Sequence, residues 1–391
     1  MFSAATSIYI LLLQFLELMI LSRYISVIDF GKLASCTITL GLVALLGNGV
    51  LSQIFLRRDA QRLPSSSRTL ILLAIIQSAL ASLVIFKLYP LVPNGFLVAG
   101  LIFLIVFSRM IYACMESVCL RAGQIRRVNY SLIVAYTIGF CSAMVLLIYF
   151  DVNGFFVLLI SLAIREVSLS SLLFCPGHLG SRSVRWTCEI RYFIKAIMFY
   201  RGFFSASLFS YALNNLDKWF VGLAFGLQNL GFYNRGLQLI QVPISILNRV
   251  LSRDVQSGML RNDKNYRKTL PVLLGLALVA ALIFFAFPDL VVRAVLGDQW
   301  QLTARILEVV CWLVILKVFL KIVDVWIRAV SSDRLYSFFY QYQLVILVMV
   351  WFFLAPGSVI EFAGVILLSS LLSSLVALAF LVKRKAPENN L

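Results

Sequence analysis

Charged residues are scarce in this chain of 391 residues, and the scarcity decides the class of protein. They make up 13% of the sequence, whereas hydrophobic residues make up 61%, and the mean hydropathy is +0.96. An ordinary soluble domain carries about 25% charged residues. The composition therefore excludes a soluble enzyme and predicts an integral membrane protein.

Histidine is nearly absent, and the cysteines lack the spacing of metal ligands. The one histidine is His178, so neither a histidine metal site nor a Ser-His-Asp triad can form. Most of the cysteines fall in apolar segments where a small side chain packs: Cys36, Cys114, Cys119, Cys141, Cys175, Cys188 and Cys311. A phosphate-binding P-loop is also missing, which excludes direct ATP hydrolysis. We expect no metal, no cofactor and no enzymatic activity.

Acidic residues are outnumbered: 17 Asp and Glu stand against 34 Lys and Arg, for a net charge of +17. The excess does not indicate nucleic acid, because the basic residues lie in short connections between apolar segments rather than in a soluble domain. Every second connection is basic, beginning with Arg57, Arg58, Arg62 and Arg68 and ending with Lys383, Arg384 and Lys385. By the positive-inside rule these connections and both termini are cytoplasmic.

Apolar segments of about 20 residues, the length of one transmembrane helix, recur along the chain. We predict twelve helices, near 2–22, 32–55, 69–89, 95–117, 129–150, 153–174, 199–223, 231–252, 269–287, 304–327, 336–355 and 359–382. The first has no basic n-region before it, so we expect it to be retained rather than cleaved as a signal peptide. Connections on the outer side are short, and the longest is amphipathic, from Pro288 to Thr303.

The longest basic connection predicts how the helices are divided into two lobes. We expect an N-terminal six-helix lobe at 1–174, a cytoplasmic linker at 175–198, a C-terminal six-helix lobe at 199–382 and a cytoplasmic tail at 383–391. A shift of 200 residues places Asn48-Gly-Val-Leu-Ser52 on Asn248-Arg-Val-Leu-Ser252. The match is short enough to arise by chance, but the even number of spans in each half also favours parallel repeats around a central cavity.

Polar side chains line one face of two consecutive predicted helices, and lipid cannot solvate such a face. On the first are Ser207, Tyr211, Asn214 and Lys218, with Asn215 and Asp217 beside them. On the second are Asn234, Gln238, Gln241, Ser245, Asn248 and Ser252, with Arg235 at the flank and Pro243 within. These faces predict the wall of a transport cavity. Pro243 predicts either a bend used in transport or a static kink.

Charges inside the predicted spans are costly and need a partner or a function. They are Glu17, Arg109, Arg165, Glu166, Asp217, Lys218, Arg235, Glu308, Lys317, Lys321 and Asp324. Lys317, Lys321 and Asp324 recur on one helical stripe, which favours a cavity. For Lys321 with Asp324, and for Arg165 with Glu166, simple neutralisation of a neighbour is an equal alternative. We expect Asp217 and Arg235, at similar depth on adjacent helices, to form an ion pair.

Several segments together resemble the Wzx-type polysaccharide exporters and O-antigen flippases of the multidrug/oligosaccharidyl-lipid/polysaccharide (MOP) flippase superfamily. The clearest is Asn215-Leu-Asp-Lys-Trp-Phe-Val-Gly with Asn229-Leu-Gly-Phe-Tyr-Asn-Arg-Gly and Val242-Pro-Ile. Further matches are Ile20-Leu-Ser-Arg-Tyr-Ile-Ser, Asp29-Phe-Gly, Leu120-Arg-Ala-Gly-Gln-Ile-Arg-Arg and Leu296-Gly-Asp-Gln-Trp300. The resemblance covers nearly the whole chain, although no single motif would suffice.

The resemblance implies a flippase of the bacterial inner membrane that moves an undecaprenyl-diphosphate-linked oligosaccharide to the periplasmic leaflet by alternating access. Such a cargo could be a repeat unit of O-antigen, lipopolysaccharide, capsule or exopolysaccharide. Its partners would be membrane lipids, a polysaccharide polymerase and a chain-length regulator, with no nucleic acid. Cavity cations suit the diphosphate, and amides suit the sugar hydroxyls. The candidate substrate-binding residues are Lys317, Lys321, Arg109, Arg165, Arg235, Lys218, Asn214, Gln238, Gln241 and Asn248.

The energy source and the cargo have open alternatives. Glu17, Asp217 and Asp324 are candidates for coupling transport to H⁺ or Na⁺. One alternative is a multidrug or other lipid exporter of the same fold. An exporter of cationic drugs would need acidic groups deep in its cavity, whereas this chain has mostly cations and amides there. A membrane-embedded polysaccharide polymerase would need an extended outer region, and the short outer connections argue against one.

Overall fold

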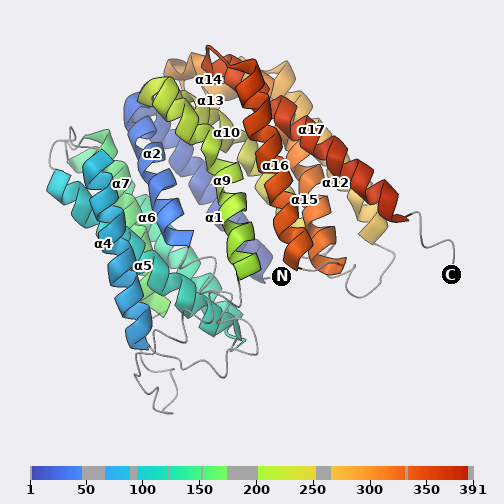
Figure 1. Cartoon of the computed structure of the whole chain (residues 1–391). Helices are drawn as coiled ribbons and strands as arrows, with labels where there is room; N and C mark the ends of the chain where they lie inside the picture. Colours follow the sequence, from blue (N-terminus) through green and yellow to red (C-terminus); the bar gives the residue numbers. More distant parts are fainter. Residues whose placement is uncertain are drawn as a thin grey trace. The chain divides into compact units, whose positions relative to one another are not determined.

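The structure is a computed structural model of the whole chain, and we describe the residues whose positions are well determined (Figure 1). These are residues 2–45, 67–88, 95–121, 123–150, 153–173, 201–251, 266–330 and 333–385. Within these ranges all regular structure is helical and there is no strand. The all-α prediction is confirmed for this part of the chain.

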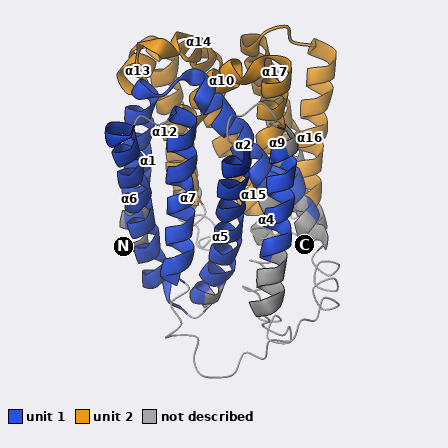
Figure 2. Ribbon diagram, turned by 90° about the vertical axis from the view of Figure 1, so that its left-hand side faces the viewer, with its two compact units in different colours: residues 1–211 blue, residues 212–391 orange. Residues whose placement is uncertain are grey.

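The chain divides into two compact units, Met1–Tyr211 and Ala212–Leu391 (Figure 2). The division falls within one helix, α9 (Arg201–Ala224), whose first half belongs to unit 1 and second half to unit 2. The linker expected at 175–198 lies outside the described residues, so the lobe boundaries remain predictions.

The described part of unit 1 contains six long helices besides the start of α9. They are α1 (Phe2–Tyr24), α2 (Val27–Leu45), α4 (Ser67–Leu88), α5 (Gly95–Arg121), α6 (Ile125–Tyr149) and α7 (Gly154–Leu173). The core between α2, α4, α5 and α7 includes Cys36, Leu40, Ala81, Ile102 and Leu159, all of them almost fully buried. Cys36 therefore packs as a small apolar residue.

Unit 2 contains the remaining described helices. They are α10 (Gly226–Val250), α12 (Tyr266–Ala286), α13 (Pro288–Val295), the short 3₁₀ helix η5 (Asp298–Trp300), α14 (Gln301–Val310), α15 (Leu313–Val330), α16 (Asp333–Leu354) and α17 (Val359–Lys385). The predicted single helix 304–327 is wrong in one respect, because α14 ends at Val310 and α15 begins at Leu313. Neither glycine nor proline marks this break, so the sequence carries no local signal for it.

Six helices in the described part are long and apolar enough to cross a membrane: Gly95–Ser117, Ile125–Tyr149, Gly154–Leu173, Thr269–Ala286, Ser337–Leu354 and Val359–Ala379. A helix of about 20 apolar residues satisfies its own backbone groups and can span the bilayer. The chain is thus a multi-pass membrane protein. The count of twelve spans stays a prediction, although described helices overlap every predicted range.

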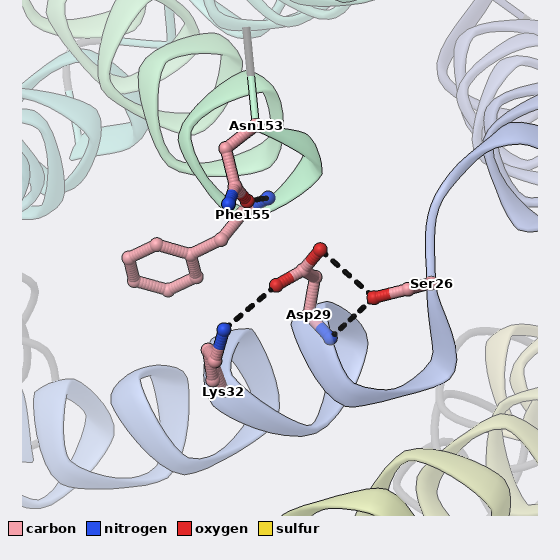
Figure 3. Close-up of polar contacts among 5 residues, drawn as sticks. All are labelled: Ser26, Asp29, Lys32, Asn153 and Phe155. Atoms are coloured by element: carbon pink, nitrogen blue, oxygen red, sulfur yellow. Dashed lines mark hydrogen bonds and ion pairs between the residues drawn. The ribbon is translucent and has the colours of Figure 1, made fainter. Parts of the chain in front are cut away.

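The turn between α1 and α2 is held by a capping box at the start of α2 (Figure 3). The Ser26 hydroxyl accepts a hydrogen bond from the Asp29 N–H at 3.2 Å and donates one to the Asp29 carboxylate at 2.8 Å. Lys32 Nζ lies 2.9 Å from the other carboxylate oxygen. This arrangement explains the Asp29-Phe-Gly motif, because Asp29 is the third helical residue and Phe30 is buried.

The start of α7 packs against the same turn. Asn153 Oδ1 caps this helix by accepting from the Phe155 N–H at 3.0 Å. A Cβ on Gly154 would lie 2.5 Å from Ile25 Cγ2, so only glycine allows this approach. Two helix N-termini, far apart in sequence, are therefore fixed together within unit 1.

In unit 2 the short helices η5 and α14 pack against α10, and α13 packs against α14. Gly297 has φ 101°, a left-handed conformation that suits glycine and turns the chain between α13 and η5. Trp300 is fully buried against Phe232, with ring centroids 5.9 Å apart. Thr303 donates its hydroxyl hydrogen bond to the Phe232 carbonyl at 3.2 Å. In the Leu296-Gly-Asp-Gln-Trp300 motif, Gly297 therefore forms the turn and Trp300 packs it against α10.

Candidate functional site

A buried carboxylate, Asp217 on α9, is at the centre of the polar groups of unit 2. Asp217 is 7% exposed, and its Oδ2 accepts a hydrogen bond from the Tyr233 hydroxyl of α10 at 2.8 Å. Its other oxygen, Oδ1, is buried and has no hydrogen-bond partner in the described part of the chain. Such a half-satisfied carboxylate is costly and calls for an explanation.

Aromatic rings close off one side of the Asp217–Tyr233 pair. Tyr233 is fully buried and contacts Phe362 of α17 edge-on, with ring centroids 6.2 Å apart. Phe220, one helical turn from Asp217, packs on Phe362 at 4.8 Å and on Trp351 of α16 at 4.2 Å. Since these rings exclude water, charge interactions of Asp217 are strengthened there.

The predicted ion pair between Asp217 and Arg235 is wrong. Among the described side chains these two form no ion pair with each other, because Asp217 bonds Tyr233 and Arg235 Nη1 donates to Gln238 Oε1 on its own helix. Depth and helix adjacency suggested the pair, but they do not fix the rotation of each helix about its axis. The tyrosine two positions before Arg235 takes the partner role.

Lys317 on α15 is one of the cations predicted to bind the diphosphate. It is partly buried, and its charge is attracted by Asp217 and repelled by Lys218. It belongs to none of the ion pairs that the structure forms among its described residues. Lys218 itself lies 3.4 Å from Asn215 Oδ1, again within α9. Lys317 therefore lies within a predicted span and has no direct anionic partner among the described residues.

Lys321 and Asp324 do pair, at 2.6 Å along α15. Asp324 is 2% exposed, and its second oxygen accepts from the Tyr340 hydroxyl of α16 at 3.1 Å. The alternative in which these charges neutralise one another is thus what the structure shows. Lys321 differs from Lys317, although both lie on one predicted stripe.

The amides of α10 form an exposed polar stripe. Gln238 and Gln241 are exposed, and Ser245 and Asn248 follow on the same face, with Asn248 Oδ1 buried and lacking a hydrogen bond. Asn214 of α9 is also exposed. Lipid would leave these groups unsolvated, so the stripe needs a polar medium or a polar ligand.

In unit 1 the predicted cation Arg165 is held by its neighbours. It lies 3.5 Å from Glu166, and its guanidinium stands 4.8 Å from the ring centre of Tyr136 on α6. Gly139 makes room for it, since a Cβ there would come within 3.0 Å of Arg165 Cβ. Glu17 on α1 also acts on this cation electrostatically. Arg165 is therefore a helix-joining residue, whereas Arg109 on α5 is exposed.

Three polar residues of these clusters were not among the predicted candidates. Glu116 of α5 forms a side-chain hydrogen bond with Tyr112, one turn earlier. Tyr233 and Tyr340 bond the two buried aspartates. The spacing of Tyr112 and Glu116 was a usable signal, but a single tyrosine in an apolar helix gives none. In the described part no group of metal-ligating side chains occurs.

Comparison with known proteins places this geometry in a family. A family model described as "Polysaccharide biosynthesis protein" matches residues 20–305. Among solved structures, the lipid II flippase MurJ in an inward closed conformation has a TM-score of 0.75 at 13% identity, covering 98% of this chain and 87% of that one. No curated protein matches this chain.

Multidrug transporters share the fold as well. An inward-facing multidrug resistance MATE family transporter of the MOP superfamily has a TM-score of 0.68 at 9% identity, covering 95% of this chain and 94% of that one. A mutant of the Vibrio cholerae MATE transporter VcmN has a TM-score of 0.66 at 13% identity, covering 99% and 96%. At these identities the likeness concerns the fold. Taken with the family match over most of its length, the chain belongs to the polysaccharide biosynthesis protein family and has the fold of MOP-superfamily transporters.

Proposed function

We propose that this protein is a flippase that carries an undecaprenyl-diphosphate-linked oligosaccharide from the cytoplasmic to the periplasmic leaflet of the bacterial inner membrane. The observation that carries the proposal is Lys317, a cation within a predicted span without a direct anionic partner in the described part, in the same unit as the exposed amides of α10. Membership of a polysaccharide biosynthesis family and the fold of a lipid II flippase support the same cargo class.

The main energetic barrier to transport is the charge of the diphosphate. A diphosphate cannot enter the low-dielectric interior of a bilayer without compensating cations. Lys317 supplies one at the α9–α10–α15 cluster, and exposed Arg109 in unit 1 is a second candidate. Gln238, Gln241, Asn214 and Asn248 offer both donors and acceptors, which suit sugar hydroxyls. Arg165 and Lys321, which are paired, serve as structural charges in this proposal.

Alternating access needs two lobes, and we retain the predicted twelve spans in two six-helix halves with both termini cytoplasmic. Export would be coupled to H⁺ or Na⁺ through Glu17 or Asp217. Asp324 is a weaker candidate, because Lys321 and Tyr340 already bond both of its oxygens. A polymerase and a chain-length regulator would act on the exported repeat unit.

The MATE likeness favours one alternative, export of cationic drugs on the same fold. A cationic drug would need an accessible carboxylate at depth. Asp217 and Asp324 of unit 2 are both almost fully buried and hydrogen-bonded to tyrosines, whereas the exposed groups of α10 are amides. Glu308 of α14 is exposed, but the charged side chains of α9, α10 and α15 that are described and not buried are Lys218, Lys317 and Lys321, which supports an anionic cargo.

The test is export itself, measured as lipid-linked repeat unit reaching the periplasmic face in cells with and without the protein. Lys317→Gln should abolish export while the protein remains at its normal level in the membrane. Arg293→Gln is the matched control, since it removes a cation of the same unit that is exposed and paired with Asp298 at 3.0 Å. Normal export by the Lys317 variant, or equal loss in the control, would contradict this cargo site.

A further inference from the structure

Unit 2 holds two sets of the same three side chains: a lysine of α15, an aspartate, and a tyrosine that follows the aspartate by 16 positions. In the set of Lys321, Asp324 and Tyr340, both carboxylate oxygens are bonded, one by the ammonium at 2.6 Å and one by the phenol at 3.1 Å. This is what a buried carboxylate requires.

The set of Lys317, Asp217 and Tyr233 is incomplete. Tyr233 bonds Oδ2 of Asp217, but Oδ1 is buried and accepts no hydrogen bond from the described residues. Lys317 is attracted by this carboxylate without forming an ion pair with it. The second set therefore also contains a lysine, Lys317, but this lysine is not bonded to the aspartate.

Two forces act on Lys317 in opposite directions. Pairing with Oδ1 would satisfy a buried oxygen that otherwise accepts no hydrogen bond from the described residues. Without that pairing the ammonium group remains available to an outside anion, since Lys317 is only partly buried. The four-carbon stem of lysine is flexible enough for both positions. When two positions of a side chain have similar free energies, a ligand that binds one of them shifts the side chain to that position.

Building on the proposed function, we propose that Lys317 alternates between Oδ1 of Asp217 and the diphosphate of the cargo. Asp217 and the cargo then compete for one ammonium group. When the diphosphate binds, Lys317 leaves the carboxylate, and when the cargo departs, Asp217 takes the lysine back. The competition weakens binding of the anion but lets it be released, which a transporter requires.

The test is titration of purified full-length protein with inorganic diphosphate at physiological ionic strength. Asp217→Asn keeps an acceptor for Tyr233 but removes the competing charge, so the dissociation constant for diphosphate should fall about fivefold to tenfold. Asp217→Glu keeps the competing charge, so the dissociation constant should not fall below the wild-type value. A structural role for Asp217 would instead weaken binding in both variants or change neither.

Two further variants separate the switch from general charge effects. In a Lys317→Gln background the Asp217→Asn change should no longer matter, because the two effects are coupled through one ammonium group. Asp298→Asn removes the same charge from an exposed pair of unit 2 and should leave the dissociation constant within twofold of wild type. A tighter-binding Asp298 variant would mean that net charge, and not Lys317, is responsible.

The outcomes also distinguish this inference from the proposed function. If wild-type cells export the lipid-linked repeat unit but Asp217→Asn does not tighten diphosphate binding, the switch is wrong and the flippase stands. If the wild type exports but binds no diphosphate, Lys317 does not receive the cargo, and the inference fails alone. If the wild type exports nothing, both proposals fall together.

Discussion

At the scale of single residues, the buried charges of this membrane protein are stabilised by specific neighbours. Arg165 illustrates this, because its guanidinium needs Glu166, the Tyr136 ring and the space beside Gly139 all at once. A cation at the bilayer centre costs at least about 2.5 kcal/mol on insertion scales. The Tyr136 ring and the space beside Gly139, both on α6, therefore help to keep α6 and α7 together.

Gly139→Ala should destabilise unit 1. The new methyl would meet Arg165 Cβ at 3.0 Å and Cγ at 3.3 Å, pushing the guanidinium off the Tyr136 ring. Overpacking of this kind costs about 1 to 3 kcal/mol. Thermal unfolding of the purified protein measures the loss. Gly100→Ala on α5 is the control, since nothing lies within 4 Å of its Cβ and alanine favours a helix. Equal stability of the two variants would refute the packing argument.

Lys321→Gln should destabilise unit 2, because it removes the ammonium group that bonds Oδ2 of the buried Asp324 carboxylate at 2.6 Å. Breaking a fully buried pair costs about 3 to 5 kcal/mol. Since a quarter of the Lys321 side chain is exposed, we expect about 2 kcal/mol. Adding Asp324→Asn should recover part of the stability in chemical or thermal unfolding. No recovery in the double variant would mean that the two charges do not stabilise each other.

At the scale of helices, apolar length and basic connections were sufficient to predict the all-α fold and the helix ranges. They did not predict the break between Val310 and Leu313, because Cys311 and Trp312 carry no helix-ending signal. The candidate site was predictable as a set of helices, α9, α10 and α15, since polar residues recur on their faces. Which cation pairs with which anion was not, because a rotation of α10 by one residue exchanges Tyr233 for a neighbour as the partner of Asp217.

Pro243 tests whether α10 must bend. The helix runs through Pro243 from Gly226 to Val250, yet proline lacks the N–H that would bond the Leu239 carbonyl. Pro243→Ala should raise the unfolding temperature, because it restores that bond, and should slow export if bending is part of transport. Pro271→Ala within α12 is the matched control and should leave export unchanged. Unchanged export in the Pro243 variant would leave the proline as a static kink.

At the scale of the whole molecule, the ends of helices carry exposed aromatic residues of the kind that gather at membrane surfaces. Phe96 begins α5, Tyr149 ends α6, Phe287 follows α12, and Phe352 and Phe353 lie near the end of α16; all five are exposed. Aromatic rings favour the headgroup region. Each of these ends adjoins a connection that the charge pattern assigns to the outer side, but Tyr130 and Phe338, exposed near the starts of α6 and α16, adjoin basic connections. Aromatic belts form at both membrane surfaces, so the rings mark helix ends and the predicted orientation rests on the charge pattern.

That orientation predicts which positions an impermeant thiol reagent reaches from outside intact cells. In a background without the native cysteines, single cysteines at Asn153, before α7, and at Gly357, before α17, should be labelled, as should one at Asn94. Single cysteines at Ser66 and Asn262, in basic connections, should react only after the membrane is opened. Labelling of Ser66 in intact cells would reverse or break the topology. It would also place the arginine-rich connections where the positive-inside rule forbids them, so that a helix count other than twelve would be needed to restore agreement.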